Sequence, residues 1–166
     1  MPFDDLMAAN RDYQATFRDR GLRGQAARGL AIVTCIDSRV DPLAMLGLKP
    51  GDAKIIRNAG ARITEDALRS LVLAANFLNV TRICVVQHTD CALARKSDAE
   101  FREGIRANTG ESAEDWRFLS MEDQESTVRQ DIAVIEACRL LPAGLELAGF
   151  IFDVHTGALS PVESES

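Results

Sequence analysis

The sequence has no long apolar run. A membrane-spanning helix needs about 20 mostly apolar residues, and no stretch of this 166-residue chain approaches that length. The first residues, Met-Pro-Phe-Asp-Asp, carry acids where a secretory signal carries bases, and no apolar signal core follows them. We therefore expect a cytoplasmic protein with no membrane partner.

The chain also lacks an excess of positive charge. It contains 25 acidic and 19 basic residues, which gives a formal net charge of −6. A nucleic-acid partner would require a basic face that replaces the counterions of the phosphates, so we expect none. A small anionic substrate remains open, because a local metal ion or arginine outweighs the global charge.

Internal repeats are absent, and the length suits one domain that buries a substantial core. Short β-branched apolar runs alternate with segments of helical periodicity, which predicts an α/β fold. The strand–helix–strand order of residues 53–87 implies a right-handed crossover, and so a mostly parallel sheet flanked by helices. We expect strands at 30–37, 53–57, 82–87 and 147–154, helices at 4–17, 64–79 and 122–141, and short helices and loops in the polar stretch 92–120.

Four cysteines are present, and in a reducing compartment they are thiols or metal ligands. Cys84 lies inside a predicted strand and Cys138 on a predicted helix, where core packing is the expected role. Cys35 lies at the C-terminal end of the first predicted strand, His88 directly follows the third, and Cys91 comes three residues later. Because ligands bind at the carboxyl ends of parallel strands, these three side chains form a candidate zinc site with an open fourth position.

Asp37 and Arg39 follow the first cysteine at alternate positions. In an extended segment alternate residues point to the same side, so Cys35, Asp37 and Arg39 are expected to converge. A carboxylate paired with a guanidinium stays ionised and accepts a hydrogen bond from a zinc-bound hydroxide. The same carboxylate, released from Arg39, is a candidate fourth zinc ligand in a closed state. The sequence leaves both states open.

These motifs resemble the beta-class carbonic anhydrases, in particular the shorter prokaryotic members. The resemblance lies in Cys35-x-Asp37-x-Arg39, Arg57-Asn58-Ala59-Gly60, His88-x-x-Cys91 and the closing Phe152-Asp153-Val154-x-Thr156-Gly157. It implies one Zn²⁺ per chain on Cys35, His88 and Cys91, with Asp37 and Arg39 as catalytic residues. The implied reaction is the reversible hydration of carbon dioxide to bicarbonate and a proton.

The resemblance also implies a quaternary arrangement. Family members are homodimers or dimers of dimers, so residues 1–24 are expected to pack on a partner subunit while residues 25–160 form the catalytic core of the single domain 1–166.

Because two thiolates cancel the charge of zinc, we expect activity to rise into mildly alkaline pH. One residue departs from the pattern: many members have glycine after the second cysteine ligand, where this chain has Ala92, whose methyl group tightens the backbone or narrows the pocket.

Two alternative functions remain. The first is a hydrolase of carbon disulfide or carbonyl sulfide on the same scaffold, since the metal site alone does not exclude those substrates. The second is a non-catalytic, zinc-stabilised binding domain, in which Asp37 closes the site.

Asp90 lies between the ligands His88 and Cys91. The sequence allows two roles for it: it orients His88, or it is a solvated or backbone-capping carboxylate.

Overall fold

A computed structural model of the chain describes residues 2–163. Met1 and residues 164–166, the two ends of the expected domain, lie outside the described residues. A single five-stranded sheet forms the centre of the molecule, with the strand order β2-β1-β3-β4-β5. Its strands are β1 (Leu30–Cys35), β2 (Ala53–Asn58), β3 (Arg82–His88), β4 (Glu146–Phe152) and β5 (Leu159–Val162). The first four are parallel and β5 is antiparallel to β4, which confirms the mostly parallel sheet.

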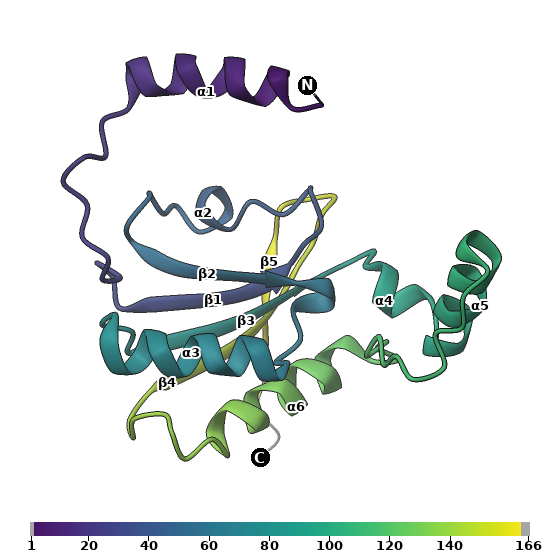
Figure 1. The fold of residues 1–166 in the computed structure, drawn as a ribbon. Coiled ribbons are helices and arrows are strands. Elements are labelled where there is room, and N and C mark those ends of the chain that lie inside the picture. Colours follow the sequence, from purple (N-terminus) through teal and green to yellow (C-terminus); the bar gives the residue numbers. More distant parts are fainter. Residues whose placement is uncertain (1, 164–166) are drawn as a thin grey trace.

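Helices cover both faces of the sheet, as Figure 1 shows. One face packs on α3 (Glu65–Phe77) and α6 (Gln124–Glu136), and its core includes Leu71, Val85 and Ile135. The short α2 (Pro42–Met45) and the loop after it cover the other face. The β1 and β3 runs are almost completely buried because they are central strands with apolar layers on both sides.

Four elements differ from the sequence predictions. In the polar stretch after β3, α4 (Ala92–Arg95) is a short helix as expected, but α5 (Asp98–Thr109) is 12 residues long and begins with a capping box. The short α2 and the edge strand β5 had not been predicted. Helix α6 ends at Glu136 rather than near Leu141, because the chain tightens into turns in which Cys138 donates to the carbonyl of Ile135 and Leu141 donates to that of Cys138.

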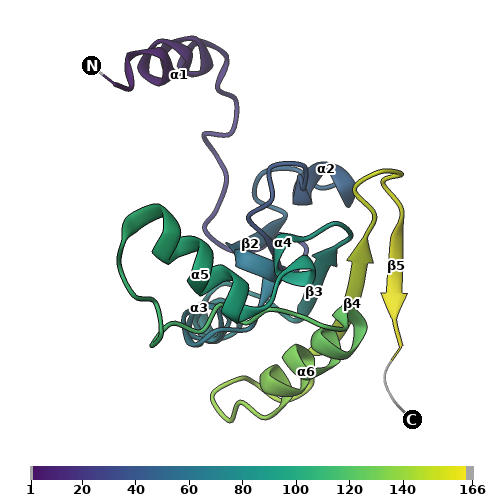
Figure 2. The ribbon, with the colours of Figure 1, turned by 90° about the vertical axis from the view of Figure 1, so that its right-hand side faces the viewer.

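The first helix, α1 (Asp4–Thr16), lies apart from the rest of the molecule in both views (Figures 1 and 2). None of its residues is buried. In the part of the chain that the structure describes, no helix combines the length and the apolar character that crossing a membrane requires.

Candidate metal centre

The three predicted ligands meet at the carboxyl end of the sheet. Cys35 is the last residue of β1, His88 is the last residue of β3, and Cys91 immediately precedes α4. Their sulfur and nitrogen atoms all lie within 4.8 Å of one another, and all three residues are buried. Strands β1 and β3 are direct neighbours, with Thr34 beside Val86, and this register brings Cys35 next to the end of β3.

The turn from His88 to Cys91 fixes the imidazole. His88 Nδ1 lies 2.7 Å from the carbonyl oxygen of Thr89 and donates to it, since a carbonyl only accepts. That bond leaves Nε2 as the free acceptor of the ring. Nε2 is buried without a hydrogen-bond partner among the described residues, although it belongs to the cluster with the two sulfur atoms. A metal ion would satisfy this nitrogen, and two sulfurs with one imidazole suit zinc.

The two thiols are linked in their protonation. A hydrogen bond between the side chains of Cys91 and Cys35 lowers the pKa of the Cys35 thiol well below its usual value. His88 and the backbone N–H groups of Asp37 and Gly60 lower it further, while burial opposes the shift. The pKa of Cys91 is raised, chiefly through the same bond to Cys35 and also by burial. The pair therefore loses one proton readily and retains the second. A bound cation favours release of the second proton, because metal-bound cysteines are thiolates.

Asp37 and Arg39 pair beside this cluster, but through a turn rather than through the extended alternation expected from the sequence. The strand ends at Cys35, and the backbone N–H of Arg39 turns back to donate to Asp37 Oδ1 over 2.9 Å. The guanidinium then binds both carboxylate oxygens, Nε to Oδ1 at 3.0 Å and Nη2 to Oδ2 at 2.8 Å. Arg39 thereby holds the pKa of Asp37 well below its usual range. Asp37 Oδ2 lies 3.8 Å from His88 Nε2, so the carboxylate borders the ligand cluster while it rests on Arg39.

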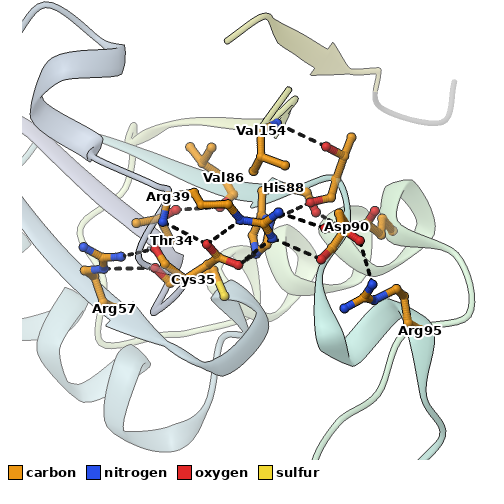
Figure 3. A network of polar contacts seen from close by, with 12 residues as sticks. Thr34, Cys35, Arg39, Arg57, Val86, His88, Asp90, Arg95 and Val154 are labelled. Atoms are coloured by element: carbon orange, nitrogen blue, oxygen red, sulfur yellow. Dashed lines mark hydrogen bonds and ion pairs between the residues drawn. The ribbon is translucent and has the colours of Figure 1, made fainter. Parts of the chain in front are cut away.

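Arg57, at the end of β2, fixes the backbone of this segment (Figure 3). Its Nε donates to the carbonyl oxygen of Cys35 at 2.9 Å, and its Nη2 donates to the carbonyl oxygen of Asp37 at 2.7 Å. One rigid guanidinium thus holds the backbone on both sides of Ile36. This arrangement sets the direction in which the chain leaves β1 and enters the Asp37–Arg39 turn.

Asp90 joins the same network from the other side. Its carboxylate accepts from Arg39 Nη1 at 2.8 Å and pairs with Arg95 Nη1 at 2.9 Å. Arg39 and Arg95 lower the pKa of Asp90. Neither role that the sequence allowed for Asp90 describes this arrangement: the partner of the His88 ring is the Thr89 carbonyl, and Asp90 binds two arginines.

Comparison with known proteins identifies the family. A family model described as carbonic anhydrase matches residues 30–159. A curated relative, beta-carbonic anhydrase 1 of Mycobacterium tuberculosis, is 38% identical over 159 residues, which are 96% of each chain. The chain belongs to the beta-carbonic anhydrase family.

Two further relatives indicate the range of the family. The crystal structure of carbonic anhydrase from Streptococcus mutans superimposes with a TM-score of 0.92 at 39% identity, covering 98% of both chains. A carbon disulfide hydrolase of Saccharolobus solfataricus is 32% identical over 155 residues, covering 80% of this chain and 76% of the relative. The α/β fold expected from the sequence is therefore confirmed, as is the family resemblance.

The remaining cysteines of this family member lie outside the cluster. Cys84 is buried in β3, and burial raises the pKa of its thiol to about 12. Cys138 is half-buried after the end of α6. Ala92, where many members have glycine, is exposed at the start of α4 and has no positive φ, so its methyl group meets no backbone strain.

Sequence reasoning missed the part that Arg57 plays, although its motif had been singled out, and it missed the two arginine partners of Asp90. The signal for Arg57 was its position at the end of β2, where side chains face the carboxyl edge of the sheet. No comparable signal existed for Asp90.

Proposed function

We propose that the protein is a zinc-dependent carbonic anhydrase that catalyses the reversible hydration of carbon dioxide to bicarbonate and a proton. One observation supports this most directly: an ionised carboxylate, Asp37, is held by Arg39 at the border of the buried Cys35–His88–Cys91 cluster. This combination provides a metal site and a fixed hydrogen-bond acceptor next to it.

Cys35, His88 and Cys91 would hold the zinc ion. When bound, zinc supplies Lewis-acid activation of water, so that a nucleophile is available at a lower pH than free water allows. The three side chains provide three ligands of the four in a tetrahedral zinc site, which leaves one position for exchangeable water in a catalytic centre.

We assign the orientation of the attacking water to Asp37. Arg39 keeps the carboxylate of Asp37 ionised, so Asp37 Oδ2 accepts a hydrogen bond from the attacking water. This bond directs a lone pair of the water oxygen at the carbon of carbon dioxide. Water and carbon dioxide then give bicarbonate, and the proton leaves to solvent or buffer. Arg39 acts in this scheme by fixing Asp37, and Arg57 by fixing the backbone on which both depend.

The zinc-stabilised binding domain requires Asp37 to close the site permanently. The bidentate pair with Arg39 offers this carboxylate a second binding partner, which suits a residue that serves as a hydrogen-bond acceptor beside the cluster. The alternative hydrolase of carbon disulfide or carbonyl sulfide has the 32% identical relative in its favour. Which substrate the protein uses depends on which molecules can reach the metal-binding cluster. An assay with each substrate distinguishes the carbonic anhydrase from the hydrolase.

We further propose a homodimer, or a dimer of dimers, in which residues 1–24 form an arm on the partner subunit and residues 25–160 form the catalytic core. The exposed apolar side chains of α1 support this, because an isolated helix of 13 residues is marginal in water without a partner. A cytoplasmic location is supported by the four cysteines, all of which are free thiols in the structure.

Stopped-flow measurement of carbon dioxide hydration on protein of known zinc content tests the proposed reaction. We expect a rate that increases from neutral to alkaline pH, and no rate in Cys91→Ala, which removes one ligand. Carbon disulfide and carbonyl sulfide are assayed in parallel through release of hydrogen sulfide. If the fully zinc-loaded protein hydrates no carbon dioxide at any pH but releases hydrogen sulfide, the hydrolase is correct; if it does neither, the catalytic proposal fails.

A further inference from the structure

The guanidinium of Arg39 is held by two acidic residues rather than one. Asp37 binds its Nε and Nη2, and Asp90 accepts from Nη1 at 2.8 Å through Oδ2. The backbone carbonyl of Asp90 accepts a further, longer bond from Nη2 at 3.3 Å. Figure 3 shows the side chain of Arg39 reaching Asp90, which also meets Arg95. Every nitrogen of the guanidinium therefore has an acceptor.

The backbone at Asp90 is unusual in a way that serves this contact. Its φ of 59° lies in the left-handed region, which non-glycine residues rarely adopt, although aspartate and asparagine tolerate it best. This conformation occurs in the turn between His88 and Cys91. It allows the chain to return Cys91 to the cluster while the Asp90 carboxylate and carbonyl both reach Arg39. Strained conformations of this kind persist where the surrounding structure fixes them, often at functional sites.

The other carboxylate oxygen of Asp90 is also occupied. Arg95, from the first turn after Cys91, binds Oδ1 at 2.9 Å. An ion-pair chain thus runs Asp37–Arg39–Asp90–Arg95 along the edge of the cluster. Arg95 balances the charge that Asp90 adds near Asp37, so Asp90 anchors Arg39 with less repulsion toward the first carboxylate.

We propose that Asp90 is a positioning residue that fixes the guanidinium of Arg39, and through it the orientation of Asp37 at the metal centre. This proposal rests on the proposed function, since it concerns the same site. The side chain of Arg39 is 41% exposed, and a free arginine side chain has many rotamers, whose loss opposes pairing with Asp37. Asp90 restricts those rotamers in advance, so the bidentate pair forms at a smaller entropic cost. It also keeps Arg39 in place whenever Asp37 moves away.

A role for Asp90 in orienting the imidazole ligand does not fit the geometry. His88 Nδ1 is bonded to the Thr89 carbonyl, and Nε2 faces the sulfur atoms. Removal of the Asp90 carboxylate is therefore expected to leave the three ligand side chains where they are. This separates a positioning role toward Arg39 from a role in metal binding, and the two give different results in zinc analysis.

The test compares Asp90→Gly and Asp90→Asn with the native enzyme. Glycine accepts the positive φ and keeps the backbone carbonyl but removes the carboxylate, while asparagine keeps the shape and one neutral acceptor. We expect kcat/KM for carbon dioxide hydration to fall roughly 10-fold in Asp90→Gly and less in Asp90→Asn, because the support of site residues is typically worth 10–100-fold. Zinc content should not change. Asp66→Asn, which removes the charge of an exposed ion pair on α3 with a 2.7 Å contact, is the control and should retain native activity.

A second readout does not depend on turnover. The Nε–H of Arg39 donates to Asp37, so its hydrogen exchange, followed by ¹⁵N NMR and assigned with Arg39→Lys, reports how firmly the pair is held. Faster exchange in Asp90→Gly, with full zinc occupancy, supports the proposal even if the native protein hydrates no carbon dioxide. Unchanged exchange overturns it, whatever happens to the rate. Loss of zinc overturns it as well, because Asp90 would then act on the ligands.

Discussion

Gly60 shows at the scale of single residues how closely the backbone approaches the metal centre. Its φ is 74°, and a Cβ built on it would lie 2.8 Å from Leu93 Cδ2, which is too close for the side chain to remain in place. Its backbone N–H is also one of the donors that lower the pKa of the Cys35 thiol. The positive φ therefore favours glycine at this position, and the close approach of the Leu93 side chain adds to that preference.

We expect Gly60→Ala to lower the free energy of unfolding by about 2 kcal/mol, from left-handed strain combined with the clash at Leu93. Urea denaturation monitored by circular dichroism measures the change. Gly104→Ala is the matched control: Gly104 lies inside α5 with open space around it, so alanine should stabilise the protein by about 0.5–1 kcal/mol. Equal effects of the two substitutions would show that the site imposes no special constraint at Gly60.

The meeting of Cys35, His88 and Cys91 was predictable at this scale because it needed only two facts, the chemistry of cysteine and histidine and the convergence of parallel strands at one edge. The pairing of Arg39 with Asp90 was not. It depends on the left-handed backbone conformation of Asp90, 51 positions further along the chain. No pattern of residue types predicts that conformation. The Asp37–Arg39 pair was predicted correctly, but for the wrong geometric reason: a turn, and not strand alternation, brings the two together.

At the scale of elements, α5 and the loop after it were the least predictable part of the sheet's surroundings. The chain between β3 and α6 has weak apolar periodicity, so it was expected to form only short helices and loops. The capping box of Ser97 and Glu100, which the structure contains, was the signal in the sequence that marked a helix start. The loop after α5 is held mainly by polar contacts, which periodicity does not detect. The Asp98 carboxylate accepts from the backbone N–H groups of Phe118 at 3.0 Å and Ser120 at 2.9 Å.

We expect Asp98→Asn to lower the free energy of unfolding by about 1.5 kcal/mol at neutral pH, since hydrogen bonds to a charged acceptor weaken. The backbone N–H and the hydroxyl of Ser120 lower the pKa of Asp98 in the folded protein, and the backbone N–H of Phe118 lowers it further. Its stabilising contribution is therefore fully present above the unfolded pKa of about 3.9 and disappears as the pH falls through the lower folded value.

Urea denaturation of Asp98→Asn and the native protein across this range should give a constant difference from neutral to mildly acidic pH, which shrinks toward strongly acidic pH. Asp66→Asn, on the exposed face of α3, is expected to change stability by less than about 0.5 kcal/mol. A difference for Asp98→Asn that grows on acidification would contradict the role assigned to the carboxylate.

At the scale of the whole molecule, α1 is the element that the rest of the chain does not explain. The four parallel strands coincide with buried apolar runs, and their parallel arrangement was predicted for the body of the protein, whereas the antiparallel edge strand β5 was not. The position of α1 was not, because within the described part of the chain its apolar residues pack on none of the buried core. Phe3, Leu6, Met7 and Tyr13 are each more than half exposed, and Figure 2 shows the helix away from the sheet and its covering helices.

The double substitution Leu6→Glu/Tyr13→Glu tests whether a second subunit covers this helix. The two residues are seven apart and lie on the same side of α1, so two charges there would oppose burial against a partner. We expect native protein to sediment as a dimer or larger assembly at micromolar concentration and the variant to sediment as a monomer. Ala8→Glu/Ala15→Glu adds the same charges at the same spacing on the opposite side of the helix, where both alanines are exposed, and should leave the assembly intact. Dissociation of both variants would show that added charge, and not the apolar side of α1, controls the assembly. A native protein that sediments as a monomer would contradict the proposal that residues 1–24 pack on a partner subunit.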